Sequence, residues 1–89
     1  MKLRAKVHPV KTPQGIAVKN IDKVPVVLPY HITYVFRGSR CVEARLELDE
    51  DWEFTLNDRK VKVKEVLRAA GLTLKDIAKI LEAEEFSIE

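Results

Sequence analysis

The fold is decided by residues 30–63, which read YHITYVFRGSRCVEARLELDEDWEFTLNDRKVKV. Apolar and polar residues alternate through most of this stretch, as they do in strands that bury one face. Three short turn sequences interrupt the alternation, Gly38-Ser39, Asp49-Glu50-Asp51 and Asn57-Asp58. The pattern therefore predicts four consecutive antiparallel strands, a β-meander, with one aromatic-rich face turned toward the core.

The first turn sets the register of the first two strands, because a slip of one residue moves every side chain to the opposite face. A two-residue turn would set aromatic residues of the first strand opposite charged residues of the second. A three-residue loop, residues 38–40, instead sets apolar residues opposite one another, Phe36 with Val42 and Tyr34 with Ala44. We therefore expect the three-residue loop. On this register the aromatic residues of the meander all point inward: Tyr30, Tyr34, Phe36, Trp52 and Phe54.

Two helices are predicted after the meander, because from Val63 the apolar spacing changes to the i, i+3, i+4, i+7 pattern of a helix face. Gly71 stands where a left-handed helix C-cap is expected. Thr73 can cap a second helix, with Asp76 at the position that completes a capping box. Both helices carry an apolar stripe, so we expect an αα-hairpin that covers the aromatic face of the sheet.

The first 29 residues contain all four prolines and give a weaker pattern. Residues 2–7 alternate cleanly and predict a strand at the edge of the sheet, alone or in a hairpin with residues 15–18. A chain of 89 residues with 46% hydrophobic content can form one core without disulfides or metal. The prediction is one α+β domain over residues 1–89.

The composition excludes several classes of protein. No apolar run approaches the roughly 18 residues of a membrane-spanning helix, and the first ten residues lack the apolar stretch of a secretory signal. We therefore expect a cytoplasmic protein with no membrane contact. The chain is 34% charged and has few Asn, Gln and Met residues, a balance typical of proteins from hot environments.

No constellation of residues predicts catalysis or metal binding. Cys41 is the only cysteine, and its spacing from His8 and His31 does not resemble a zinc site. Cys41 and His31 share the polar face of the meander, but no third group is tied to them. The acidic turn at residues 49–51 is too short to supply the ligands of a calcium ion. We expect no enzyme activity, no cofactor and no small-molecule substrate.

Residues 64–81, KEVLRAAGLTLKDIAKIL, resemble a DNA-binding helix-turn-helix in the placement of Gly71. Leu67, however, stands where that motif places a small residue to let the helices touch. The second helix also exposes acidic residues, which repel phosphates. The sequence therefore favours a plain αα-hairpin.

The charge is unevenly distributed along the chain. Residues 1–42 carry eight Lys or Arg against Asp22 alone, whereas residues 43–89 carry eight against thirteen Asp or Glu. The macrodipole disfavours the acids after the second helix. We therefore hypothesise that the acidic tail to Glu89 neutralises the basic strand Lys2-Arg4-Lys6, within one chain or across a dimer.

The candidate binding residues are the basic side chains expected on the polar face of the sheet: Lys2, Arg4, Lys6, Arg37, Arg45, Lys60 and Lys62. Such a face could follow RNA or DNA through weakly specific electrostatic contact. The aromatic residues of the sheet are expected on the opposite face, under the helices, so no platform for base stacking is predicted. We therefore predict a small non-enzymatic interaction module that contacts a protein or a second copy of itself, with nucleic-acid binding as the alternative.

Overall fold

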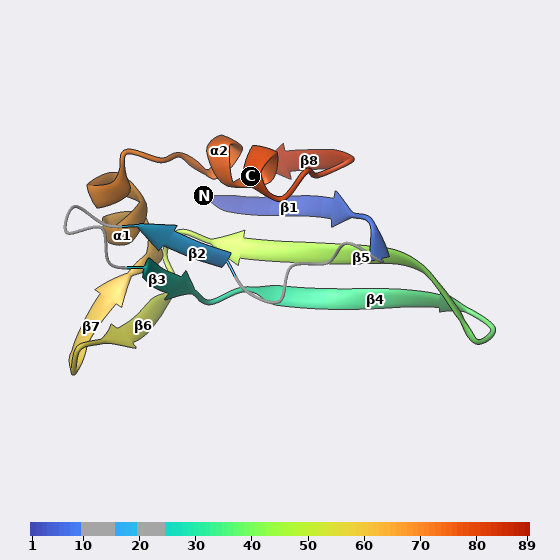
Figure 1. Cartoon of the computed structure of the whole chain (residues 1–89), viewed down its shortest axis with the longest axis horizontal. Helices are drawn as coiled ribbons and strands as arrows, with labels where there is room; N and C mark the ends of the chain where they lie inside the picture. Colours follow the sequence, from blue (N-terminus) through green and yellow to red (C-terminus); the bar gives the residue numbers. More distant parts are fainter. Residues whose placement is uncertain (10–15, 20–24) are drawn as a thin grey trace.

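The computed structural model describes residues 1–9, 16–19 and 25–89. The predicted α+β class is confirmed, because a mostly antiparallel sheet is packed by two helices (Figure 1). The elements are β1 (Lys2–Val7), β2 (Ile16–Lys19), β3 (Pro25–Leu28), β4 (His31–Arg37), β5 (Arg40–Asp49), β6 (Glu53–Leu56), β7 (Arg59–Lys62), α1 (Val63–Ala70), α2 (Leu74–Ile80) and β8 (Glu85–Ile88).

The main sheet has four strands in the order β4-β5-β1-β8, and every neighbouring pair is antiparallel. The predicted continuous meander is therefore wrong beyond β5. The strands β6 and β7 pair with each other in a separate two-stranded sheet. The second edge of β5 is taken by β1, and all residues of β1 pair with β5. The strand β6 is shorter, with four residues, and does not occupy this edge.

The N-terminal strand lies inside the sheet, between β5 and β8, so its predicted edge position is also wrong. The tail supplies the edge through β8, which was not predicted as a strand. Residues 16–18 belong to β2, which pairs with β3 and not with β1. Residue 15 of the predicted hairpin partner lies outside the described residues.

The hairpin of β4 and β5 keeps the predicted register at Tyr34, whereas the predicted turn and the predicted pairing of Phe36 with Val42 are wrong. Tyr34 lies opposite Ala44 as predicted, and the next apolar pair, Ile32 and Leu46, also lie opposite each other. The loop, however, has two residues, with a positive φ of 66° at Gly38. A β-bulge restores the register, so that Phe36 lies opposite Cys41 and Val42 is the extra residue.

The core lies between the main sheet and a layer formed by the two helices and the β2–β3 hairpin. Fully buried Leu3, Leu46 and Leu48 from the sheet belong to one cluster with Ile77 of α2 and Val26 of β3. Tyr30, Trp52 and Phe54 pack against this cluster as partly buried residues. The αα-hairpin therefore covers part of the apolar face as predicted, and the β2–β3 hairpin covers another part.

Both predicted helix caps are confirmed. Gly71 adopts the left-handed conformation, with φ 71° and ψ 26°, and its N–H donates to Arg68. At the start of α2 the N–H of Thr73 donates to Asp76 Oδ2 at 2.8 Å, and the N–H of Asp76 donates to Thr73 Oγ1 at 3.3 Å. This reciprocal capping box fixes where α2 begins.

Replacing Thr73 with alanine is expected to lower the free energy of unfolding by about 1 kcal/mol, because an N–H at the start of α2 loses its acceptor. The donors of Thr73 lower the pKa of the Asp76 carboxyl below its ordinary value of 3.8. The stability that this carboxylate contributes is therefore present above that ordinary value and is lost as the pH falls through the folded pKa. Urea unfolding of the wild type and of Asp76→Asn between neutral and acidic pH measures this difference. Equal acid sensitivity of the two proteins would contradict the role of Asp76.

Candidate interaction surfaces

Four of the seven predicted basic residues lie together on the polar face of the main sheet: Lys2, Arg4 and Lys6 on β1 and Arg45 on β5. The register sets Lys6 opposite Arg45 and Arg4 opposite Glu47. The other three lie elsewhere. Arg37 ends β4 beside the hairpin turn, and Lys60 and Lys62 belong to β7 in the separate sheet.

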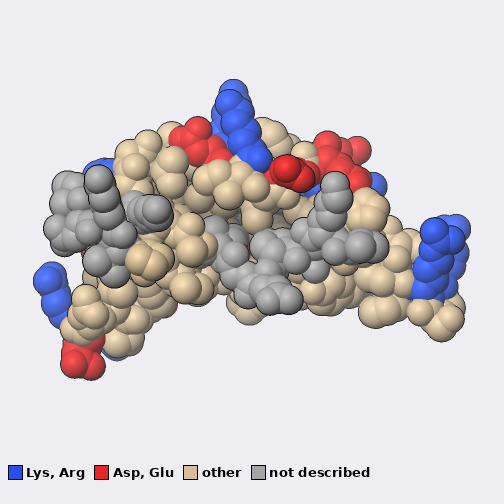
Figure 2. Space-filling model, in the orientation of Figure 1, with Lys and Arg blue, Asp and Glu red and all other residues tan. Residues whose placement is uncertain are grey.

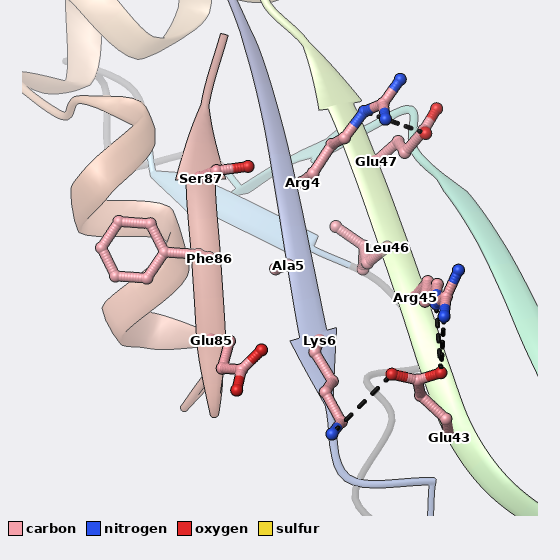
Figure 3. A pocket seen from close by; sticks show the side chains of 10 residues that line it. All are labelled: Arg4, Ala5, Lys6, Glu43, Arg45, Leu46, Glu47, Glu85, Phe86 and Ser87. Atoms are coloured by element: carbon pink, nitrogen blue, oxygen red, sulfur yellow. Dashed lines mark hydrogen bonds and ion pairs between the residues drawn. The ribbon is translucent and has the colours of Figure 1, made fainter.

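The four basic residues of this group face carboxylates at short range, and Figure 3 shows three of them, Arg4, Lys6 and Arg45. Glu47 lies 3.4 Å from the Nε of Arg4 and 3.9 Å from the Nζ of Lys2. Glu43 lies 3.0 Å from the guanidinium of Arg45 and 3.8 Å from Lys6. These pairs reduce the positive potential that this face could offer to a phosphate backbone. Nucleic-acid binding through this face stays a prediction, and the face does not present a concentrated positive surface.

The acidic tail lies beside β1, the basic strand that it is predicted to neutralise. Strand β8 pairs with β1, which sets Glu85 opposite Lys6, and the carboxylate of Glu89 lies 3.3 Å from Arg4 Nε. The tail also contributes a strand, so its contact with β1 includes backbone hydrogen bonds as well as charge.

A hollow on the same face is lined by these ion-paired side chains, together with Glu85, Phe86 and Ser87 of β8 (Figure 3). Among the described residues, no group of three or more His, Cys, Asp or Glu could hold a metal ion. Cys41 Sγ lies 3.6 Å from the carbonyl oxygen of Glu43, near the hairpin turn. The ring of His31 instead packs edge-on against Trp52 at 4.9 Å, at the other end of β4. Cys41 and His31 therefore lie near opposite ends of the β4–β5 hairpin and do not form a pair.

The β4–β5 hairpin forms an arm that continues past the ends of β1 and of both helices (Figure 1). On this arm Tyr34 is 45% exposed, Phe36 61% and Val42 43%. We call these three residues the arm patch. The prediction that Tyr34 and Phe36 are buried under the helices is wrong.

Element lengths explain why the arm patch is exposed. The ten residues of β5 span about 33 Å, whereas the eight residues of α1 span about 12 Å and the seven of α2 less. Two such short helices cannot cover the full length of the sheet. The ratio of predicted strand length to predicted helix length was the signal in the sequence that could have identified the arm patch.

The outer strand of the arm is also an edge of the main sheet, because no strand among the described residues pairs with the second side of β4. This edge is seven residues long, and Arg37 is its only permanently charged side chain. The opposite edge, β8, has four residues and is bordered by Glu84 and Glu89. Shortness and charge are the features that protect an edge from pairing. By these criteria β8 is protected and β4 is open.

Comparisons with protein-family models, curated proteins and solved structures find no match for this chain. In the part of the chain that the structure describes, no helix is long and apolar enough to cross a membrane. The function is therefore inferred from the charged face, the arm patch and the open edge.

Proposed function

We propose that the protein is a non-enzymatic, cytoplasmic interaction module that binds another polypeptide through β4 and the arm patch. One observation carries this proposal, which is that exposed aromatic side chains lie on an edge strand that projects beyond the rest of the fold and whose second side pairs with no strand among the described residues. Exposed apolar side chains gathered at one place mark contact sites on soluble proteins. The open strand adds backbone donors and acceptors that an extended partner can pair with.

Strand pairing and the arm patch would contribute in different ways. Backbone hydrogen bonds along β4 supply affinity for any extended segment, whereas side chains on alternate positions select the partner. Tyr34 and Phe36 lie on the same side of β4, two residues apart. A matching partner therefore presents apolar side chains at every second residue.

The charges favour a polypeptide over a nucleic acid. Arg37 and Arg40 at the end of the arm have no carboxylate within 4.0 Å among the described residues, and Figure 2 shows basic side chains at this end. Two cations give few phosphate contacts, and binding to a nucleic-acid backbone grows with their number. The aromatic side chains of the arm could still stack on bases, so the test below has to separate the two outcomes.

Photo-crosslinking tests the surface directly. A photoreactive aromatic amino acid replaces Phe36 in one variant and Ile80 of α2 in a control, because the two side chains have nearly equal exposure, 61% and 59%. After irradiation in cells, we expect covalent polypeptide adducts from position 36 and few from position 80. Equal yields, or no adduct from position 36, would refute the proposal. An adduct to RNA or DNA from position 36 would replace it with the nucleic-acid alternative.

A further inference from the structure

We infer that the partner of the arm is a second copy of this chain, paired β4 to β4 in antiparallel orientation, so that the two main sheets join into one sheet of eight strands. This inference rests on the proposed function and names its partner. Three observations support it: the symmetry that β4 permits, the position of the arm on an elongated molecule, and the area that the chain leaves exposed.

The symmetry of such a pair decides which faces meet. A two-fold axis that relates antiparallel neighbouring strands runs perpendicular to the sheet, so both copies turn the same face to the same side. A register centred on Tyr34 sets this residue opposite Tyr34 of the partner subunit and sets Ile32 opposite Phe36 of the partner subunit. Directly opposed aromatic and β-branched side chains stabilise antiparallel pairs. The apolar side of β4 is thus complementary to itself.

The polar side of β4 is compatible with the same register. Thr33 then lies opposite Val35 of the partner subunit, and His31 lies opposite Arg37 of the partner subunit. Within its own chain His31 neighbours Glu47 on β5. The guanidinium of the partner's Arg37 would therefore lie one strand away from a carboxylate on the same face. No acidic or lysine side chain of β4 has to be buried, because β4 contains none.

The antiparallel arrangement also places the end of each arm beside the body of the partner. The chain is elongated, with extents of 44 × 23 × 22 Å, and the arm projects at one end (Figure 1). His31 lies at the body end of β4 and Arg37 at the free end. Pairing therefore brings the exposed Phe36 of each copy next to the partly buried Ile32 of the other.

The exposed area agrees with a missing contact. The chain has an accessible surface of 6302 Å², whereas a monomer of its mass is expected to have about 5300 Å². The excess of about 1000 Å² is comparable to the roughly 800 Å² that each partner buries in a specific interface. An elongated shape itself raises this area, and the exposed surface is large enough to contain one specific interface.

Charge-swap variants at the centre of the register test the inference on the purified chain. Tyr34→Lys and Tyr34→Glu each set like charges opposite one another, and we expect each to weaken dimerisation by roughly 30-fold, the size of a hot-spot substitution. Mixing the two variants sets Lys opposite Glu and is expected to restore the dimer. Sedimentation equilibrium over a range of protein concentrations gives the dissociation constants. Thermal unfolding followed by circular dichroism shows that each variant is folded, and Ile80→Glu on α2 is the control for adding charge.

Several results would overturn the inference. A purified wild-type chain that stays monomeric at all concentrations refutes the dimer. A dimer that Tyr34→Lys leaves intact has a different interface, and failure of the mixed variants to associate refutes the register. If the wild type is monomeric while position 36 crosslinks to a different polypeptide, this inference falls and the proposed function stands. If position 36 forms no adduct at all, both fall.

Discussion

Replacing Leu46 with alanine is expected to lower the free energy of unfolding by about 2–5 kcal/mol, the usual cost of removing a buried leucine side chain. Leu46 is fully buried at the middle of β5, between Ala5 of β1 and Ile32 of β4. Its side chain also belongs to the cluster that the helices cover. The substitution therefore leaves a cavity that several elements have to fill together. Urea unfolding at low protein concentration measures the effect.

Ile80→Ala is the matched control for Leu46→Ala, because Ile80 is 59% exposed on α2 and loses few contacts when truncated. We expect this control to change the free energy of unfolding by at most about 0.5 kcal/mol. If Leu46→Ala destabilises the protein no more than this control does, the main sheet is not packed as described.

Deleting residues 84–89 is expected to lower the free energy of unfolding by about 3 kcal/mol or more, at low and at high salt alike. The deletion removes the backbone pairing of β8 with β1 and the contacts that Phe86 and Ile88 keep, although these side chains are 42% and 39% exposed. The ion pair between Arg4 and Glu89 joins two half-exposed side chains, and such pairs contribute little. Urea unfolding in low and high salt separates the two kinds of contribution.

A double variant, Glu85→Gln with Glu89→Gln, is the control for this deletion, because it removes the charges and keeps the strand. We expect it to cost about 0.5 kcal/mol or less, and only at low salt. A loss as large as that of the deletion would show that charge, and not the strand, holds the tail. Neutralisation of the basic strand by the acidic tail would then explain the stabilising effect of the tail without the pairing of β8.

The parts of the fold that were predicted correctly depend on local patterns. The pairing of Tyr34 with Ala44 follows from the alternation of apolar and polar residues within two strands joined by a short turn. The cap at Gly71 and the capping box of Thr73 and Asp76 each involve residues a few positions apart. Local geometry is encoded within a few residues, so one sequence is sufficient to read it.

The parts that were predicted wrongly depend on distant partners. The pairing of β1 with β5 joins residues 37 to 47 positions apart, from Val7 with Ala44 to Lys2 with Asp49, and alternation alone does not say which strand is the neighbour. Four residues of β8 are too few to show a period. The bulge at Val42 let a two-residue turn keep the register that a three-residue loop was expected to give.

The candidate surface was misplaced for a related reason. The aromatic residues were assigned to the core because they share a face with Leu46 and Leu48, which are buried. Sharing a face does not ensure coverage when the covering helices are shorter than the strands. Tyr34 and Phe36 therefore lie on the apolar side of the sheet and are nevertheless exposed, which moves the expected contact from the charged face to the arm.

Amide hydrogen exchange along β4 tests the central claim most directly. Alternate N–H groups of an edge strand point away from its only neighbour and exchange freely in a monomer, whereas strand pairing on the second side protects them as well. We predict that residues 31–37 are protected at both sets of amides in concentrated solution, and that only the set bonded to β5 stays protected in Tyr34→Lys. Rapid exchange of the outward amides of the wild type at every concentration would contradict the account.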